Sequence, residues 1–114
     1  MIFTDLEHKE LIKTFKDLIT KSHEMKIISP FITKQAFNLF YEEFESFFAN
    51  NGKLQILTTT CNKAASSFNI DDLYQINKFN NTHIKVQVIN NQSPIHMKVY
   101  VFNTKEGIYA IFRF

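Results

Sequence analysis

Two side chains that could carry phosphoryl-transfer chemistry lie two residues apart near the end of the sequence, His96 and Lys98. Apolar residues alternate around them and predict a β-strand over residues 95–102, in which residues two apart project from the same face at about 7 Å. An imidazole offers a nucleophile or a general acid near neutral pH, and an ammonium can hold a phosphate oxygen. We therefore expect the pair to meet one anion, as a minimal set of groups for phosphoryl transfer without a metal.

A His-x-Lys pattern also arises by chance, and a strand with one polar face needs no function. Whether the pair has a function therefore depends on the helices and strands that would position it. Thr4 and Glu7 fit a capping box before a run of helical periodicity. Thr33 can cap a second helix with a stripe of Phe side chains, and Asn50 to Gly52 can end it. The predicted helices are residues 5–21, the segment between Thr33 and Asn50, and residues 71–79, the last after a polar loop over 60–69.

Short apolar runs and period-two alternation predict strands between these helices. The first three are residues 25–29, 54–58 and 84–88. Alternation of helix and strand favours a largely parallel sheet, because parallel neighbours need crossover connections. Residues 95–102 and 108–114 flank a polar turn at 103–107 that contains Gly, which predicts an antiparallel hairpin. The fold class is thus α/β, with a mixed, largely parallel sheet flanked by helices and a C-terminal antiparallel hairpin.

The composition limits the classes of function. A chain of 114 residues fits one domain over 1–114, and 45% apolar residues supply a core. The net charge of +2 is too small for a nucleic-acid coat protein, so an anionic partner must be held locally. Cys61 cannot form an internal disulfide, and the sequence shows neither a signal segment nor a membrane-spanning run. We expect a cytoplasmic protein that does not associate with a membrane.

In this setting the chain resembles the phospholipase D superfamily, whose signature is His-x-Lys followed by an Asp. His96, Lys98 and Asn103 occupy the three signature positions. The segments 26–32 and 52–58 look like the first two core strands of nuclease-type members. In the residues of these strands and in its small size, the chain resembles the branch of metal-independent restriction endonucleases and helicase-associated nucleases more than the lipid hydrolases.

The resemblance implies a mechanism that needs two copies of the motif. His96 would attack phosphorus to form a phosphohistidine, and the same residue of a second copy would protonate the leaving oxygen. Since the chain has one copy, the working site would form in a symmetric homodimer acting on DNA, with no cofactor and no metal. Lys98 would neutralise the phosphate. Ser29 and Thr58, at the ends of predicted strands, are possible site-lining residues, with ordinary capping or turn bonding as the equally strong alternative, and Asn103 is a further possible site-lining residue.

Two departures from the family pattern favour an alternative. Asn103 replaces the Asp of the signature, and no Gly-Ser-x-Asn follows, so Arg113 is a candidate substitute in holding phosphate. We therefore expect a domain truncated at its C-terminus, with a bare sheet edge at the last strand. The alternative function is a truncated or degenerate, inactive module that binds DNA or a protein, and a third possibility is an unrelated scaffold subunit.

The remaining candidate residues have simpler explanations. His8, His23 and His83 are not at zinc-like spacing from Cys or carboxylates, so we expect them to be exposed and to bind no metal. Cys61 follows the second predicted strand, where α/β proteins often place a site, but a buried or idle thiol is the simpler expectation.

Overall fold

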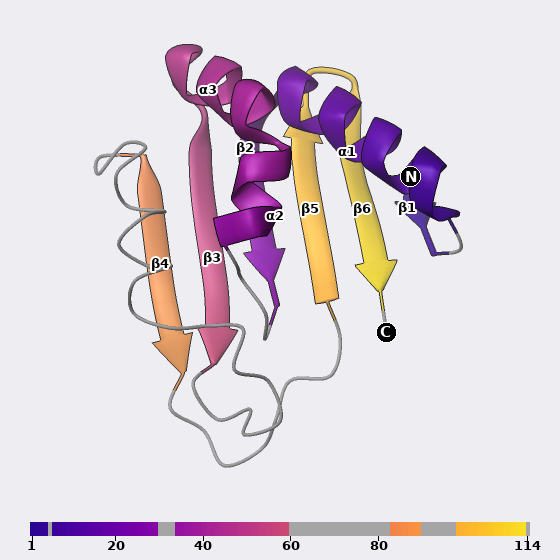
Figure 1. The fold of residues 1–114 in the computed structure, drawn as a ribbon. Coiled ribbons are helices and arrows are strands. Elements are labelled where there is room, and N and C mark those ends of the chain that lie inside the picture. The colour runs from indigo at the N-terminus through magenta and orange to yellow at the C-terminus, as the bar shows by residue number, and fades with distance from the viewer. Residues whose placement is uncertain (5, 30–33, 60–82, 90–97, 114) are drawn as a thin grey trace.

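The computed structural model describes residues 1–4, 6–29, 34–59, 83–89 and 98–113, and these build one six-stranded sheet. The strand order is β1-β6-β5-β2-β3-β4 (Figure 1). Three neighbouring pairs are parallel, and the two pairs that involve β5 are antiparallel. The predicted α/β class, the largely parallel sheet and the C-terminal hairpin are confirmed. The strands are β1 (Ile2–Phe3), β2 (Ser22–Ile28), β3 (Lys53–Thr59), β4 (Ile84–Ile89), β5 (Lys98–Thr104) and β6 (Gly107–Arg113).

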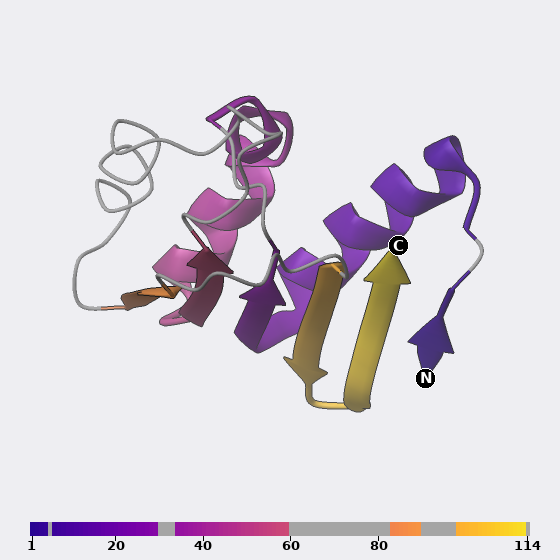
Figure 2. The ribbon, with the colours of Figure 1, turned by 90° about the horizontal axis from the view of Figure 1, so that it is seen from below.

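The three described helices cover one face of this sheet (Figures 1 and 2). They are α1 (His8–Lys21), α2 (Lys34–Leu39) and α3 (Tyr41–Ala49). Strand alternation sends every second side chain toward them, for example Met25 and Ile27 from β2 and Leu54 and Ile56 from β3, all of which are buried. The core therefore lies between the helices and one sheet face, and this face is the one relevant to the site.

The first helix begins at His8, three residues later than predicted. Glu7 is its N-cap and makes no side-chain capping bond, so the predicted capping box of Thr4 and Glu7 was wrong. The reason is a strand that the sequence patterns did not reveal, because Ile2 and Phe3 pair in parallel with β6 as β1. β1 also covers part of β6, which corrects the expectation of a bare edge there.

The predicted Phe-rich helix is divided in two at Phe40, whose backbone angles of φ −112° and ψ 26° are not helical. The Phe40 N–H donates to the Phe37 carbonyl at 3.2 Å, in an i to i+3 bond. The division still leaves Phe37 and Phe44 in contact, with ring centroids 4.9 Å apart. The two short helices thus bury the same Phe stripe that the sequence predicted.

The predicted end of the Phe-rich segment is confirmed. Asn51 adopts the left-handed conformation at φ 63°, its N–H donates to the Phe48 carbonyl, and the Gly52 N–H donates to the Phe47 carbonyl. These two bonds form a Schellman motif, which satisfies carbonyls that the helix end would otherwise leave unpaired. A Cβ on Gly52 would lie 2.6 Å from the buried Phe47 ring, so Gly fits here by size. The motif starts β3 directly after α3.

The hairpin turn is tighter than the predicted turn over residues 103–107. Thr104 pairs with Gly107, so the turn consists of Lys105 and Glu106 alone. The Thr104 hydroxyl donates to the Gly107 carbonyl at 2.9 Å and accepts from the Glu106 N–H at 3.2 Å, and Gly107 takes a positive φ of 142°. This turn fixes which residues of β5 and β6 face each other. The predicted loop over 60–69, the helix over 71–79 and the strand start at 95–97 lie outside the described residues.

Candidate functional site

One end of the sheet, which we call the site end, combines strand ends from distant parts of the chain. β2, β3 and β4 run in parallel and finish there, β6 also finishes there, and β5 runs the opposite way and starts there (Figure 1). Lys98 is the first residue of β5 and therefore lies at this end. His96, which precedes it by two residues, is outside the described residues.

Ser29 lies at the site end beside Lys98. Ile28 pairs with Val99 across β2 and β5, so the next step of the same register brings Ser29 opposite Lys98. The Ser29 N–H donates to the Leu57 carbonyl of β3 at 3.1 Å, and Ser29 is 1% exposed. The Thr58 backbone follows Leu57 and pairs with Val88 of β4. The structure thus brings the backbones of Ser29, Thr58 and Lys98 to the same end of three adjacent strands.

Asn103 does not lie with these residues. It is five residues beyond Lys98 on β5, which corresponds to about 17 Å along an extended strand. Its register partners are Glu24 and Ile108, at the far end of β2 and β6. An odd number of steps along a strand also reverses the face, so Asn103 projects to the opposite face from Lys98. The structure separates the predicted site-lining Asn103 from the site end.

Arg113, which the sequence offered as a substitute in holding phosphate, lies at the site end, although its pairing with Lys98 was not predicted. It is the register partner of Lys98 across β5 and β6, so the two cationic side chains share a face at the site end. The Arg113 Nη1 donates to the Leu6 carbonyl at 3.2 Å, which anchors the guanidinium to the segment before α1. This pairing depends on the length of the hairpin turn. The predicted turn over 103–107, centred on Lys105, would place Phe112 opposite Lys98, whereas the observed two-residue turn places Arg113 there.

Tyr100 is a site residue that the sequence analysis did not identify; it lies two positions after Lys98 and hence on the same face. Its ring packs edge-on against Phe15 with centroids 4.8 Å apart. Burial raises the pKa of the Tyr100 phenol above its ordinary value of 10.0, although a hydrogen bond with Ser29 and the positive charge of Arg113 act to lower it. Tyr100 is therefore a neutral hydroxyl at physiological pH, which supplies polarity without charge beside two cations.

The raised pKa of Tyr100 predicts a late step in an alkaline titration. We expect tyrosinate absorbance to contain a component that appears above pH 10, and Tyr100→Phe should remove it. Because the folded state holds this proton more tightly, its contribution to stability is complete below pH 10 and is lost as the pH rises through the folded-state pKa. A titration of Tyr100→Phe identical to that of the native chain would contradict the assignment.

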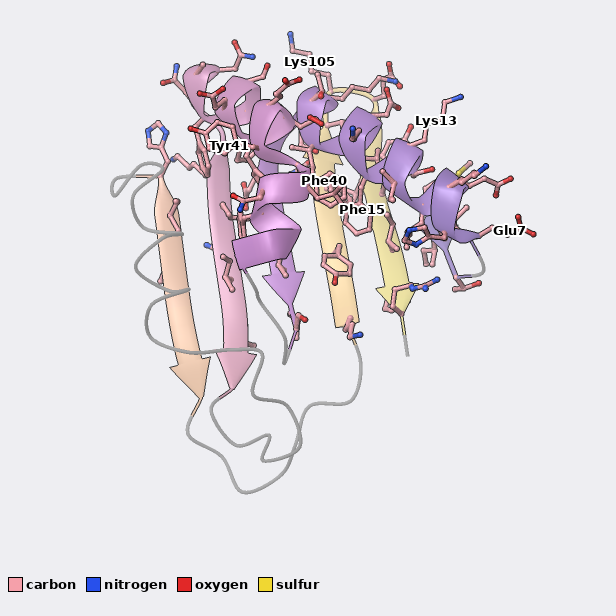
Figure 3. All side chains as sticks on the ribbon, viewed as in Figure 1. Glu7, Lys13, Phe15, Phe40, Tyr41 and Lys105 are labelled. Carbon is pink, nitrogen blue, oxygen red and sulfur yellow. The ribbon has the colours of Figure 1, made fainter. Side chains whose placement is uncertain are left out.

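A cavity of about 210 Å³ opens beside Ser29 and Tyr100, between the sheet and the helices. Phe15 and Phe40 contribute to its lining, and their rings face each other with centroids 5.5 Å apart (Figure 3). The lining is mostly apolar, and the Ser29 and Tyr100 side chains contribute the hydroxyl groups. An apolar wall next to the site end lowers the local dielectric and strengthens charge interactions made there.

The charges of the site end suit an anion. Within the described part of the chain, no group of three or more His, Cys, Asp or Glu residues is arranged to hold a metal ion. Lys98 and Arg113 instead offer an ammonium and a guanidinium on one face, with the Tyr100 and Ser29 hydroxyls beside them. Such donors bind phosphate, the guanidinium in bidentate fashion and the ammonium as a point charge. None of the helices that the structure describes is long and apolar enough to span a bilayer.

Comparison with known families gives one match that covers most of the chain. The family model described as the NgoFVII restriction endonuclease N-terminal PLD domain, where PLD stands for phospholipase D, matches residues 9–112. The matched region includes Lys98 and Tyr100 and ends one residue before Arg113. No curated protein sequence matches the chain.

A solved structure is similar in fold. The polyphosphate kinase of Porphyromonas gingivalis superimposes with a TM-score of 0.57 at 8% sequence identity. The superposition covers 86% of this chain but 16% of the kinase, so the chain spans a small part of that protein. At this identity the likeness shows a shared fold and no more.

Proposed function

Because this chain belongs to the family of the NgoFVII restriction endonuclease N-terminal phospholipase D domain, we propose that it is a nuclease-like domain that acts on a phosphodiester of DNA. The observation that carries the proposal is the position of Lys98 within the family match, at the site end and on the same face as Arg113. Two cations at that position suit a nucleic-acid backbone, whose phosphates supply most of the affinity in protein–DNA binding. The small net charge of +2 is consistent with local rather than global attraction.

The proposed reaction has two steps and uses His96 from two chains. A nitrogen of one His96 attacks phosphorus and forms a P–N bond while the P–O bond to the leaving strand breaks, and His96 of the other chain donates a proton to that oxygen. The second His96 then removes a proton from water, which attacks phosphorus and releases the first His96. Lys98 stabilises the charge on the phosphoryl oxygens in both transition states. Histidine supplies the nucleophile, so the proposed reaction requires no metal and no cofactor.

The two-fold arrangement follows from the single copy of the motif. A symmetric dimer places the same patch of both chains at the interface, so His96 and Lys98 of both subunits would meet at one phosphate. In this proposal the monomer contains half a site. The activity per chain should therefore depend on chain concentration.

A second candidate is a module of the same fold that binds DNA or a protein without cleaving it. The departures from the signature favour it: Asn103 replaces Asp, and β6 carries no Gly-Ser-x-Asn. The two candidates differ in one observable, which is cleavage of the backbone.

The test is nicking of supercoiled plasmid DNA in excess EDTA over a range of chain concentrations. We expect nicking that resists EDTA, with a rate per chain that rises with concentration and levels off where sedimentation shows the dimer to be complete. Binding of the plasmid without nicking at any concentration would favour the non-catalytic module. An undiminished rate per chain at concentrations where sedimentation shows a monomer would contradict the dimeric site.

A further inference from the structure

We propose that Arg113 contacts the phosphate directly and forms, with Lys98, a two-cation clamp on the DNA backbone. The inference rests on the proposed function and adds a binding residue to it. Arg113 follows the last residue of the family match, so the family comparison does not assign it a role. The argument depends instead on its position in the sheet.

The hairpin register holds the two cations together. Lys98 and Arg113 are directly opposite each other on β5 and β6, and Cβ atoms of such partners lie about 5 Å apart. The two-residue turn at Lys105 and Glu106, fixed by the Thr104 hydroxyl, determines this register. A shift of one residue would turn Arg113 to the other face. The structure thus specifies the proximity of the two charges through the backbone, not through flexible side chains.

Like charges directly opposite each other on an antiparallel pair repel, and a phosphate bound by both would offset that repulsion. Within the described residues, Arg113 makes no ion pair with a carboxylate, and its hydrogen bond goes to the neutral Leu6 carbonyl. That bond engages one of five guanidinium N–H groups and restrains the orientation of the side chain. An arginine held in this way is prepared for bidentate binding of a phosphate at little entropic cost.

The neighbours of Arg113 on the same face support the same ligand. The positive charge of Arg113 acts on the Tyr100 phenol, which places the guanidinium on the side of Tyr100 and Ser29. These groups are hydroxyls and carry no negative charge at neutral pH. They can donate to phosphoryl oxygens and do not compete with phosphate for the guanidinium. The clamp therefore consists of two cations with neutral donors beside them.

The experiment measures binding of a short fluorescein-labelled DNA duplex in EDTA by anisotropy, over a series of salt concentrations. Arg113→Gln should weaken binding by about tenfold or more and reduce the salt slope by about one phosphate contact. Arg113→Lys should retain the salt slope but lose part of the affinity, because an ammonium cannot bind in bidentate fashion. Lys98→Gln should resemble Arg113→Gln.

The matched control is Lys105→Gln, which removes an exposed cation from the hairpin turn at the far end of the same strand pair (Figure 3). It should leave affinity within about twofold and the salt slope unchanged. Thermal unfolding of each variant shows whether the substitution also lowers stability, as loss of the Arg113 bond to Leu6 would. If Arg113→Gln unfolds, Arg113→Lys decides the inference, since a purely structural role would not separate affinity from salt slope.

The outcomes for the two proposals are distinguishable. Native-like affinity and salt slope in Arg113→Gln overturn the clamp even if the native chain nicks plasmid in EDTA. A tenfold loss in Arg113→Gln supports the clamp even if the native chain binds DNA without nicking it, which would overturn only the nuclease proposal. A native chain that does not bind the duplex overturns both.

Discussion

Replacement of His96 by alanine should reduce EDTA-resistant nicking by about 10³-fold or more, the largest effect expected of any substitution in this chain. The proposed reaction uses the imidazole twice, as nucleophile in one subunit and as acid and base in the other. Removing it from both subunits removes both functions at once. The measurement is the initial rate of conversion of supercoiled to open-circular plasmid. DNA binding should fall much less, because the Lys98 and Arg113 contacts remain.

Mixing experiments give this prediction a sharper form. If an active site needs both subunits, the His96→Ala chain should capture native chains in inactive mixed dimers, and at constant total chain concentration the rate should fall with the square of the native fraction. Lys105→Gln added in the same proportion is the control and should not inhibit. Rates that are simply proportional to the amount of native chain would show that each subunit acts alone. Nicking that persists in pure His96→Ala would remove His96 from the mechanism.

Replacement of Phe102 by alanine should produce the largest loss of stability, about 3–5 kcal/mol. Phe102 is fully buried on β5, the strand that joins β2 to β6, and its ring packs edge-on against Phe15 of α1 with centroids 5.7 Å apart. Alanine would leave a cavity where the sheet meets the helices. Urea unfolding followed by circular dichroism measures the change as a shift of the midpoint at constant slope.

Two variants calibrate this result. Phe102→Leu fills most of the space and should cost less than Phe102→Ala. Ile108→Ala on β6 removes an apolar side chain that is 60% exposed, so its effect should be within about 0.5 kcal/mol of zero. A loss below about 1 kcal/mol for Phe102→Ala would mean that this part of the core does not support the sheet.

The sequence predicts the described helices and strands well where apolar periodicity is regular. β4 begins at Ile84 as expected, β3 extends one residue beyond the predicted segment at each end, and the Asn50 to Gly52 end of the Phe-rich segment is confirmed. The likeness to the phospholipase D superfamily is also confirmed, by the family match over residues 9–112. These features depend on short-range patterns, which a single sequence displays directly.

The features that were missed depend on tertiary pairing. Ile2 and Phe3 are too few to show a strand period, and they are extended because β6 accepts them as a neighbour. The division at Phe40 leaves the period of the Phe stripe unchanged, so no pattern marks it. The hairpin was predicted, but its register was not, because composition alone does not choose between a five-residue turn and a two-residue turn.

The contrast between short-range patterns and tertiary pairing also explains which site residues the sequence revealed. Alternation was sufficient to propose Lys98 as one member of a polar pair on β5, and the strand ends suggested Ser29. The partnership of Lys98 with Arg113 depends on the exact turn, and that of Tyr100 with Ser29 depends on the β2–β5 register. Asn103 was predicted to line the site because it occupies a position of the family signature. The length of β5 and the alternation of its side chains place it far from Lys98 and on the opposite face.

The order of strands has a consequence for how the chain reaches its folded state. β1 and β2 are separated in sequence by little more than α1, yet in the sheet the hairpin of β5 and β6 lies between them. During synthesis the ribosome releases this hairpin after all the other described strands, so until then β2 has an unpaired side and β1 has no neighbour. Contacts of such long sequence separation slow folding. The nascent chain therefore exposes an open edge of β2 until the hairpin of β5 and β6 has emerged.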